Sequence, residues 1–218
     1  KKLDTPVTGG NVSFYNESPD YAVYPTPTIG MVGLIEDVDC MVTSYFKNEG
    51  DIIAIIGNVK CSDSIGGSEY LQQQYNLVKG DAPEIDLDKE FSLVNALIQL
   101  AKAKCINSAH DVSDGGIAVN IAESCLINRT LPIGCTVNIE YKGRPDFYLF
   151  NESHGRAVIS FNKENEDIVK KICNNNNIEY LNIGKTGGKA VIINKEVNIP
   201  LEIAKDAYYN SISQIMEN

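Results

Sequence analysis

An unbroken run of apolar residues, Ile52–Ile56, bounded by Asp51 and Gly57, constrains the fold more than any other feature of the chain. Such a run is short for a helix and rich in β-branched residues, as is typical of a buried strand. Segments with helical spacing of apolar residues follow it and alternate with further short apolar runs, without a strict period. This order predicts an α/β or α+β fold.

The same patterns predict five helices and several further strands. We expect helices from Ser68 through Gln74, from about 86 to 101, and over 117–127, 164–175 and 201–216, with strands over 105–109, 133–139, 157–161, 180–183 and 190–193. In the second helix Asp86 or Asp88 is the candidate N-cap, and an apolar face is formed by Phe91, Val94, Leu97, Ile98 and Ala101. Gly184–Gly188 lacks the Walker order of a phosphate loop and predicts a hairpin turn.

The N-terminal segment has a different character. Alternation over Thr5–Asn16 and an apolar run over Thr28–Glu36 predict two strands at the hairpin-like edge of a sheet whose other strands lie outside the chain. The motif begins within a few residues of Lys1, which indicates a cut inside a longer polypeptide. We place the boundary to the next unit within 38–48.

Composition excludes several classes of function. The 218 residues carry a formal net charge of −10, and the basic residues are dispersed, which argues against a nucleic-acid partner. No apolar run approaches the roughly 20 residues of a membrane span, and we expect a soluble, cytoplasmic protein. The cysteines lack a CxxC pair and are expected to be reduced and structural; they are Cys40, Cys61, Cys105, Cys125, Cys135 and Cys173.

Gly9-Gly10-Asn11-Val12-Ser13 is the most informative polar stretch. Glycines allow a close backbone approach to an anionic group, and the carbonyl oxygen of Asn11 is a hard ligand suited to Mg²⁺. Ser13, two residues on, would share its face of a strand. This pattern suits the phosphates of a nucleotide and the group being phosphorylated. A glycine bulge with Asn and Ser facing solvent remains the alternative.

Two further polar clusters follow. His110-Asp111-Val112-Ser113-Asp114-Gly115-Gly116 lies between a strand end and a helix start, where phosphate and Mg²⁺ are often received, but Asp114 could equally cap the helix and the glycines form a tight turn. The second cluster is Phe150-Asn151-Glu152-Ser153-His154-Gly155-Arg156. Adjacent Ser and His without a nucleophile elbow argue against a catalytic triad, so recognition of a polar ligand is the better interpretation.

Three blocks in this order, Thr5–Glu17, Pro25–Asp37 and Ala109–Gly116, resemble the phosphoribosylformylglycinamidine synthase family. The first block is specific to that family. Relatives of the wider architecture, such as aminoimidazole ribonucleotide synthetase, selenophosphate synthetase and thiamine monophosphate kinase, have a similar Asp-Gly-Gly region but lack the first block. The resemblance runs over essentially the whole chain.

The resemblance implies a long polypeptide with two tandem pairs of an A domain and a B domain. Residues 1–42 would be the end of the second A domain, which is like the N-terminal domain of aminoimidazole ribonucleotide synthetase. Residues 43–218 would be the complete second B domain, which is like its C-terminal domain. The implied reaction is an ATP-dependent ligation in purine biosynthesis, which converts formylglycinamide ribonucleotide and glutamine-derived ammonia to the amidine.

Position by position, the resemblance assigns Gly10 to ATP, Asn11 to Mg²⁺ and Ser13 to the formylglycinamide ribonucleotide. Asp111 resembles the repeat counterpart of a metal-binding Asp, and Glu152-Ser153-His154 stands where the first half has Glu-Ser-Gln, so these residues would form a second-half pseudo-site in which His154 departs from the pattern. Neither His110 nor His154 matches the family's catalytic histidine, so no catalytic residue is expected here.

The implied partners are the missing N-terminal half, a glutaminase subunit and a small bridging subunit, or fused equivalents. A homodimer of the chain is also possible, because an incomplete A domain exposes apolar surface. Two other functions compete with the enzyme interpretation. One is a noncatalytic scaffold that holds a structural nucleotide, and the other is an independent small-molecule kinase, which would need a complete ATP site within this chain.

Overall fold

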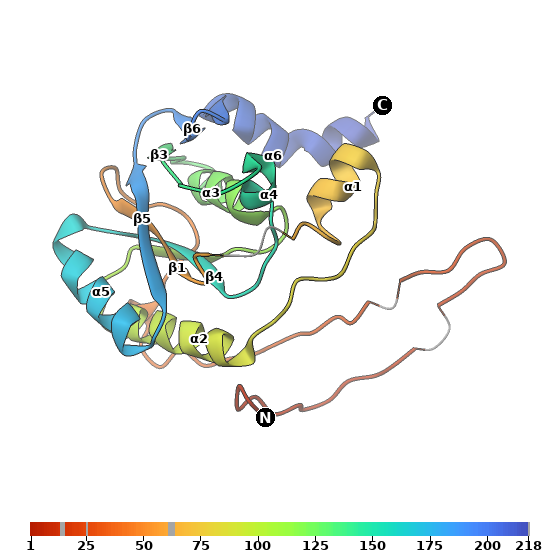
Figure 1. Cartoon of the computed structure of the whole chain (residues 1–218), viewed down its shortest axis with the longest axis horizontal. Helices are drawn as coiled ribbons and strands as arrows, with labels where there is room; N and C mark the ends of the chain where they lie inside the picture. Colours follow the sequence, from red (N-terminus) through yellow and green to blue (C-terminus); the bar gives the residue numbers. More distant parts are fainter. Residues whose placement is uncertain (14–15, 25, 61–63, 218) are drawn as a thin grey trace.

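The computed structural model describes residues 1–13, 16–24, 26–60 and 64–217. The chain has two unlike parts, an N-terminal arm, residues 1–42, and a packed body that begins at Thr43, where a bridge joins Thr43 to Ser108. Figure 1 shows the arm leaving the body as a long loop that runs out and returns. Cys61 lies outside the described residues.

The body is built on one seven-stranded sheet with the strand order β2-β4-β1-β5-β3-β6-β7. All neighbours are antiparallel except β3 and β6, which are parallel. The strands are β1 (Ile52–Gly57), β2 (Ser108–Asp111), β3 (Cys135–Val137), β4 (Arg156–Phe161), β5 (Glu179–Thr186), β6 (Ala190–Ile193) and β7 (Val197–Pro200).

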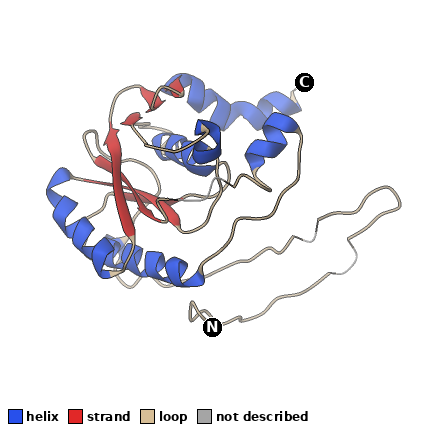
Figure 2. Cartoon of the chain, in the orientation of Figure 1, coloured by secondary structure: helices blue, strands red, loops and turns tan. Residues whose placement is uncertain are grey.

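Strand β1 is buried throughout, as its sequence predicts, and it divides the interior into two cores. Because side chains alternate across a strand, Ile53 and Ile55 enter one core while Ile52, Ala54 and Ile56 enter the other. Helices cover both faces (Figure 2). They are α1 (Glu69–Tyr75), α2 (Leu87–Lys102), α3 (Gly116–Leu126), α4 (Pro145–Leu149), α5 (Glu166–Asn175) and α6 (Leu201–Met216), with 3-10 turns η1 (Val38–Cys40) and η2 (Lys163–Asn165).

The two cores are closed by different helices. Helices α2 and α5 cover one face of the sheet, whereas α3, α4 and α6 lie on the other (Figure 1). Four of the five described cysteines are buried, and all five are free thiols, as predicted.

The two strands predicted in the arm are not formed among its described residues. The arm is extended, and its one backbone bridge joins Glu17 to Ala22 near the tip. A strand is stable only when a neighbour accepts its hydrogen bonds, and the described residues on either side of the tip stay apart. Residues 14, 15 and 25 lie outside the described part.

Three other predictions about the body are wrong in detail. Gly184–Gly188 does not form a hairpin, because β3 lies between β5 and β6 in the sheet. The apolar face expected for α2 points mostly outward: Leu93, Ala96 and Leu100 are the buried residues of this helix. The strand predicted over 105–109 begins instead at Ser108 and ends at Asp111.

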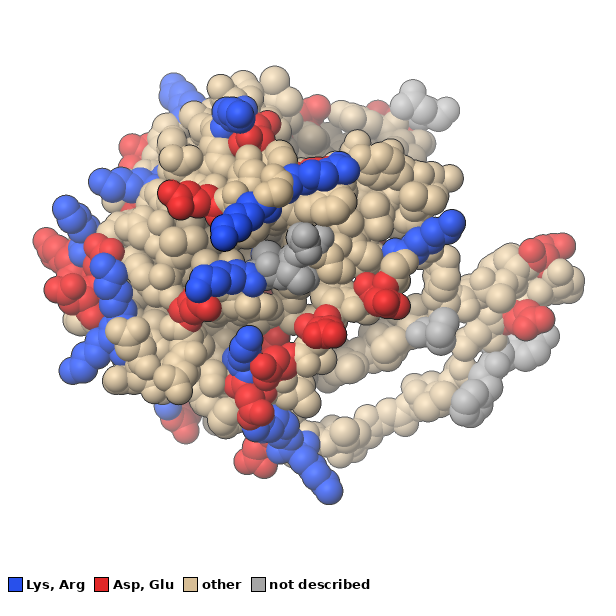
Figure 3. All heavy atoms as spheres, viewed as in Figure 1, with Lys and Arg blue, Asp and Glu red and all other residues tan. Residues whose placement is uncertain are grey.

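Charge is dispersed over the body and sparse along the arm. On the face seen in Figure 3, Lys and Arg alternate with Asp and Glu over the body, while most of the arm is uncharged. Within the described ranges, no helix is long and apolar enough to cross a membrane.

Candidate functional site

The polar motif of the arm is fully exposed. Gly10, Asn11 and Ser13 lie on its outgoing segment. Among the described residues, their only hydrogen bond joins the Ser13 carbonyl to Asn16 Nδ2, at 3.1 Å. A Cβ at Gly9 or Gly10 would meet nothing within 4 Å, and neither residue has a positive φ. The conformation of the arm therefore gives no reason for glycine here.

The glycine pair after β2 has the opposite surroundings. Gly115 and Gly116 have φ of 75° and 68°, a region that favours glycine. A Cβ on Gly116 would lie 2.7 Å from the carbonyl oxygen of Asn151. The start of α3 thus packs directly on the backbone after α4, which explains this pair by packing alone.

Glu152 joins the starts of two helices. Its Oε1 accepts hydrogen bonds from Gly115 N–H at 2.8 Å and from Glu69 N–H at 3.0 Å. Gly115 precedes α3 and Glu69 opens α1, and the positive end of a helix favours a carboxylate. The carboxylate therefore holds α1 and α3 together, in a region that the sequence assigned to a pseudo-site.

A buried arginine fixes the loop that carries Glu152. Arg156 is 2% exposed, and its Nε donates to the Ser153 carbonyl at 3.1 Å while Nη2 donates to the Asn151 carbonyl at 2.6 Å. The Asn151 Oδ1 also accepts from Ser153 N–H at 2.8 Å. The sequence places Asn151 and Arg156 in the polar cluster, but nothing in the pattern shows that this arginine is buried.

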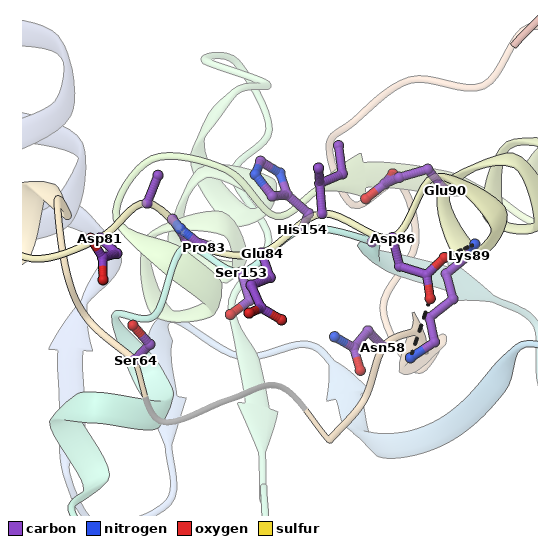
Figure 4. Close-up of a pocket in the computed structure, with 13 residues that line it drawn as sticks. Asn58, Ser64, Asp81, Pro83, Glu84, Asp86, Lys89, Glu90, Ser153 and His154 are labelled. Atoms are coloured by element: carbon purple, nitrogen blue, oxygen red, sulfur yellow. Dashed lines mark hydrogen bonds and ion pairs between the residues drawn. The ribbon is translucent and has the colours of Figure 1, made fainter. Parts of the chain in front are cut away.

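Ser153 and His154 line a cleft of about 580 Å³. The other wall is the linker before α2, and Figure 4 shows its acidic side chains arranged around Ser153 and His154, with Asp86 paired to Lys89. The lining residues are Asn58, Ser64, Asp81, Ala82, Pro83, Glu84, Ile85, Asp86, Lys89, Glu90, Ser153, His154 and Gly155. Acidic groups outnumber basic ones in this set, which disfavours a phosphate ligand.

Asp111 stands at the end of β2 with its side chain exposed. Its carbonyl accepts from Asn120 Nδ2 at 2.6 Å, so its backbone is fixed by α3. Within the described residues, no group of three His, Cys, Asp or Glu side chains is placed to hold a metal ion. The body therefore offers Asp111 no obvious set of companion ligands.

His110 contacts a serine and a glutamate, but these three side chains do not form a catalytic site. Its Nδ1 lies 3.2 Å from Ser124 Oγ, and its Nε2 lies 3.6 Å from a Glu123 oxygen. Ser124 is 1% exposed and donates to the Asn120 carbonyl at 2.9 Å, so no substrate can reach it. Burial raises the pKa of the Glu123 carboxyl group, and the nearby carboxylates of Asp111 and Asp114 add to this rise. The neighbouring His110 offsets part of it.

The structure separates the two predicted groups of site residues. Glu152, Ser153 and His154 lie in one loop of the body, and Glu152 reaches the turn after Asp111. Gly10, Asn11 and Ser13 lie on the arm. The hydrogen bonds of the described residues from 5 to 36 all have their partners within the arm. The arm motif and the body motifs do not form one site in this chain.

Curated proteins resemble nearly the whole chain, arm and body together. The sequence is 40% identical over 216 residues to the phosphoribosylformylglycinamidine synthase subunit PurL of Caldanaerobacter subterraneus subsp. tengcongensis, which covers 97% of this chain and 29% of the relative. It is 42% identical over 204 residues to subunit PurL of Chlorobaculum tepidum, covering 89% and 27%. The chain thus spans less than a third of the length of these curated relatives.

Solved structures show the fold. Thermotoga maritima PurL complexed with FGAR superposes with a TM-score of 0.62 at 16% identity, covering 77% of this chain and 30% of that one. The same protein complexed with ATP gives a TM-score of 0.58 at 17% identity, covering 77% and 28%. The family model described as AIR synthase related protein, C-terminal domain, matches residues 48–194, well over half of the chain. The chain belongs to this AIR synthase related family.

Proposed function

We propose that the chain is part of a phosphoribosylformylglycinamidine synthase, an ATP-dependent ligase of purine biosynthesis in the cytoplasm. The observation that carries this proposal is the 40% identity to a PurL subunit over 97% of the chain. The structures of a PurL with FGAR and with ATP add that a protein of this fold binds both molecules.

The reaction proceeds in two displacements. The amide oxygen of formylglycinamide ribonucleotide attacks the γ-phosphorus of ATP, and ADP leaves, which gives an iminophosphate. Ammonia then attacks the amide carbon, loses a proton, and expels inorganic phosphate to leave the amidine. Catalysis of such a transfer rests on positioning and on neutralising phosphate charge.

In this proposal the arm supplies one wall of the site. The backbone of Gly10 approaches the phosphates of ATP, Ser13 contacts the ribonucleotide substrate, and Asn11 faces Mg²⁺. The arm glycines support the first role, because neither their conformation nor any neighbour requires glycine. A close approach by a ligand is a physical reason that remains.

The described residues fit Mg²⁺ only in part. Asn11 offers one exposed amide oxygen, whereas Mg²⁺ needs near-octahedral oxygen coordination. No cluster of three acidic, His or Cys side chains completes it within the described ranges. We therefore route no step of the reaction through the metal, and the remaining ligands would come from phosphate, water or residues outside this chain.

The proposed partners follow from the fraction of its relatives' length that the chain covers. A chain that spans 29% of a PurL relative would work with the rest of that polypeptide. A glutaminase subunit and a small bridging subunit would deliver ammonia, and a Thermotoga maritima structure is named PurLQS.

A second role for the body has its own support. Glu152 caps two helices and Gly116 is packed against backbone, so both are explained by stability. The body would then be a noncatalytic scaffold beside the site, and residues 111 and 152–154 a structural remnant of the repeat.

A segment exchange tests the proposed function. The matching segment of the Caldanaerobacter PurL is replaced by this chain, and the chimera is assayed for ATP-dependent amidine formation with ammonium as nitrogen source. We expect the folded chimera to form product and ADP in equal amounts. A chimera that folds and binds ATP but forms no product would contradict the proposal.

Isothermal titration of the chain alone separates the arm from the body. With Mg·ATP or Mg·ADP we expect no binding, because the arm is one wall of an incomplete site. Binding that survives Asn11→Ala but is lost with Asp111→Ala would instead assign a complete nucleotide site to the body.

A further inference from the structure

Each of the two cores of the body contains a pair of buried cysteines. Cys125 and Cys135 belong to the core closed by α3, and Cys105 and Cys173 belong to the core closed by α2 and α5. All four are at most 3% exposed, and all four are free thiols. The sulfur atoms of the two pairs nevertheless have different hydrogen-bond partners.

In the first pair the two thiols contact each other. The Cys125 thiol donates a hydrogen bond to the Cys135 sulfur. In the second pair the Cys105 thiol instead donates to the carbonyl of Leu100, with a sulfur-to-oxygen distance of 3.5 Å. Two sulfurs in hydrogen-bond contact need to move only a short way to reach the S–S bond length of about 2 Å. Of these two pairs, the first therefore has the arrangement that a disulfide requires.

The backbone holds both members of the first pair in place. Cys135 opens β3, which pairs with β5 on one side and with β6 on the other. Cys125 lies in the last turn of α3, and its carbonyl accepts a hydrogen bond from Ile133 N–H at 3.2 Å. The two ends of the loop 126–134 are thus already together, so little loop-closure entropy remains to be lost when an S–S bond forms. The bond would join the end of α3 to the interior of the sheet.

We propose that Cys125 and Cys135 are a redox pair that closes to a disulfide when a small peroxide reaches it. Cys135 is the attacking residue, because its sulfur accepts hydrogen bonds from the Cys125 thiol and from the Ile192 backbone N–H. These donors lower the pKa of the Cys135 thiol, whereas the hydrogen bond to Cys135 raises the pKa of the Cys125 thiol. Cys125 is therefore the resolving residue. The pair does not depend on the proposed function.

The reaction consumes one peroxide for each pair. The Cys135 sulfur attacks a peroxide oxygen, the O–O bond breaks, and one water leaves with the thiol proton, which gives a sulfenic acid. The Cys125 sulfur then attacks the Cys135 sulfur, so that the S–S bond forms and the S–O bond breaks, and the Cys125 proton leaves in a second water. The two thiols lose two electrons, which the peroxide takes up.

Entry of the peroxide depends on the loop 126–134. The cysteines are buried, but this loop reaches the surface, where Leu131 is 69% exposed. Two of its backbone hydrogen bonds have lengths of 3.2 Å, from Ile133 N–H to the Cys125 carbonyl and from Gly134 N–H to the Gly188 carbonyl. We expect local opening of this loop, and not global unfolding, to admit a molecule as small as hydrogen peroxide. Oxidation should therefore occur in the folded chain.

Peptide mapping of the oxidised chain tests the pair. Cys40→Ser and Cys61→Ser first remove the two other cysteines, so that no thiol exchange with them takes place. Hydrogen peroxide is added to this chain, free thiols are then blocked with N-ethylmaleimide, and the non-reduced peptides are identified by mass spectrometry. We expect a linked Cys125–Cys135 peptide in at least about tenfold excess over any link within the other buried pair. Circular dichroism verifies that the chain stays folded, and dithiothreitol should reverse the link.

Two variants test the roles of the two thiols. Cys125→Ala should accumulate a sulfenic acid at Cys135 that dimedone traps, because no thiol resolves it. Cys135→Ala should give at least about tenfold less dimedone adduct at Cys125, whose thiol is the poorer nucleophile. Cys173→Ala, in the other core, is the matched control and should leave formation of the disulfide unchanged.

The mapping decides the proposal without any substitution in the cores. Absence of the linked peptide from the folded chain would overturn it, as would a link that forms only after unfolding in urea. Equal linking of Cys105 to Cys173 would also overturn it, because burial of two thiols in one core would then be sufficient. A dimedone adduct that forms equally at Cys125 and at Cys135 in the two variants would contradict the assigned roles.

Discussion

The two glycine pairs show how differently the arm and the body use the same residues. In the body, Gly115-Gly116 adopts left-handed backbone and packs against Asn151, so structure alone explains it. In the arm, a Cβ at Gly9 or Gly10 would meet nothing within 4 Å, and neither residue has a positive φ. The fold thus explains why glycine is needed at 115 and 116, but it does not explain glycine at 9 and 10. The described structure therefore accounts for the glycine pair of the body and leaves that of the arm without a structural reason.

The largest expected difference between the two regions is in amide hydrogen exchange. The amides of Ile53–Ile56 lie in the central strand, and their exchange should require global unfolding. The arm amides between 5 and 13 have no backbone partner among the described residues and should exchange at the rate of an unfolded peptide. Mass spectrometry should find at least a ~10³-fold contrast. Protected arm amides at low protein concentration would break the division into arm and body.

Alanine at the two glycine pairs should give the next largest contrast. Gly116→Ala puts a Cβ 2.7 Å from a carbonyl oxygen at a φ of 68°, and should lower the free energy of unfolding by about 3 kcal/mol or more. Gly10→Ala should change it by less than about 0.5 kcal/mol. Urea unfolding measures both, and equal effects would contradict the contrast.

Glu152 sharpens the assignment of the body motifs to stability. Glu152→Ala removes the acceptor for two backbone N–H groups and should lower the free energy of unfolding by about 2 kcal/mol. Glu152→Gln keeps an oxygen acceptor and should lower it less. The matched control is Glu140→Ala, an exposed carboxylate without a partner among the described side chains. No loss in Glu152→Ala would leave its role in the pseudo-site as the better interpretation.

The smallest expected effect is a pH dependence at Glu123. Burial raises the pKa of this carboxyl group above 4.5, so the folded state binds its proton more tightly than the unfolded state does. The resulting stabilisation is present below pH 4.5 and is lost as the pH rises through the folded pKa. Glu123→Gln should remove this fall, seen as a smaller decrease of Tm between pH 4.5 and neutrality. An unchanged pH profile would show that His110 compensates the buried charge.

Much of the body could be predicted from the sequence. Strand β1 and helix α6 match their predictions almost residue for residue, because an unbroken apolar run and a long periodic segment are strong local signals. Helix α4 and strand β7 were not predicted, because elements of five and four residues carry little periodicity. The prediction of two strands in the arm was wrong because a strand needs a neighbouring strand to pair with, and the periodicity of the sequence does not show whether one is present.

The site could be predicted only at the level of motifs. Sequence reasoning found Glu152 and Gly116 but left ligand binding and packing open, since the two uses require the same residue types. The buried setting of Arg156 and the acidic wall of the cleft depend on contacts between residues far apart in the sequence. For α2, the sequence pattern correctly predicts an apolar face, but the helix has two such faces and the pattern does not show which one enters the core.

The central claim is that the arm residues act in catalysis and not in stability, and Asn11 tests it most directly. In the PurL chimera, Asn11→Ala should lower kcat/KM for ATP by at least about a hundredfold, because it removes an oxygen that would help to hold Mg²⁺ beside the transferring phosphates, with Tm unchanged. Asn175→Ala, at an exposed asparagine ending α5, is the control. Full activity of Asn11→Ala, or a loss that follows Tm, would contradict the account.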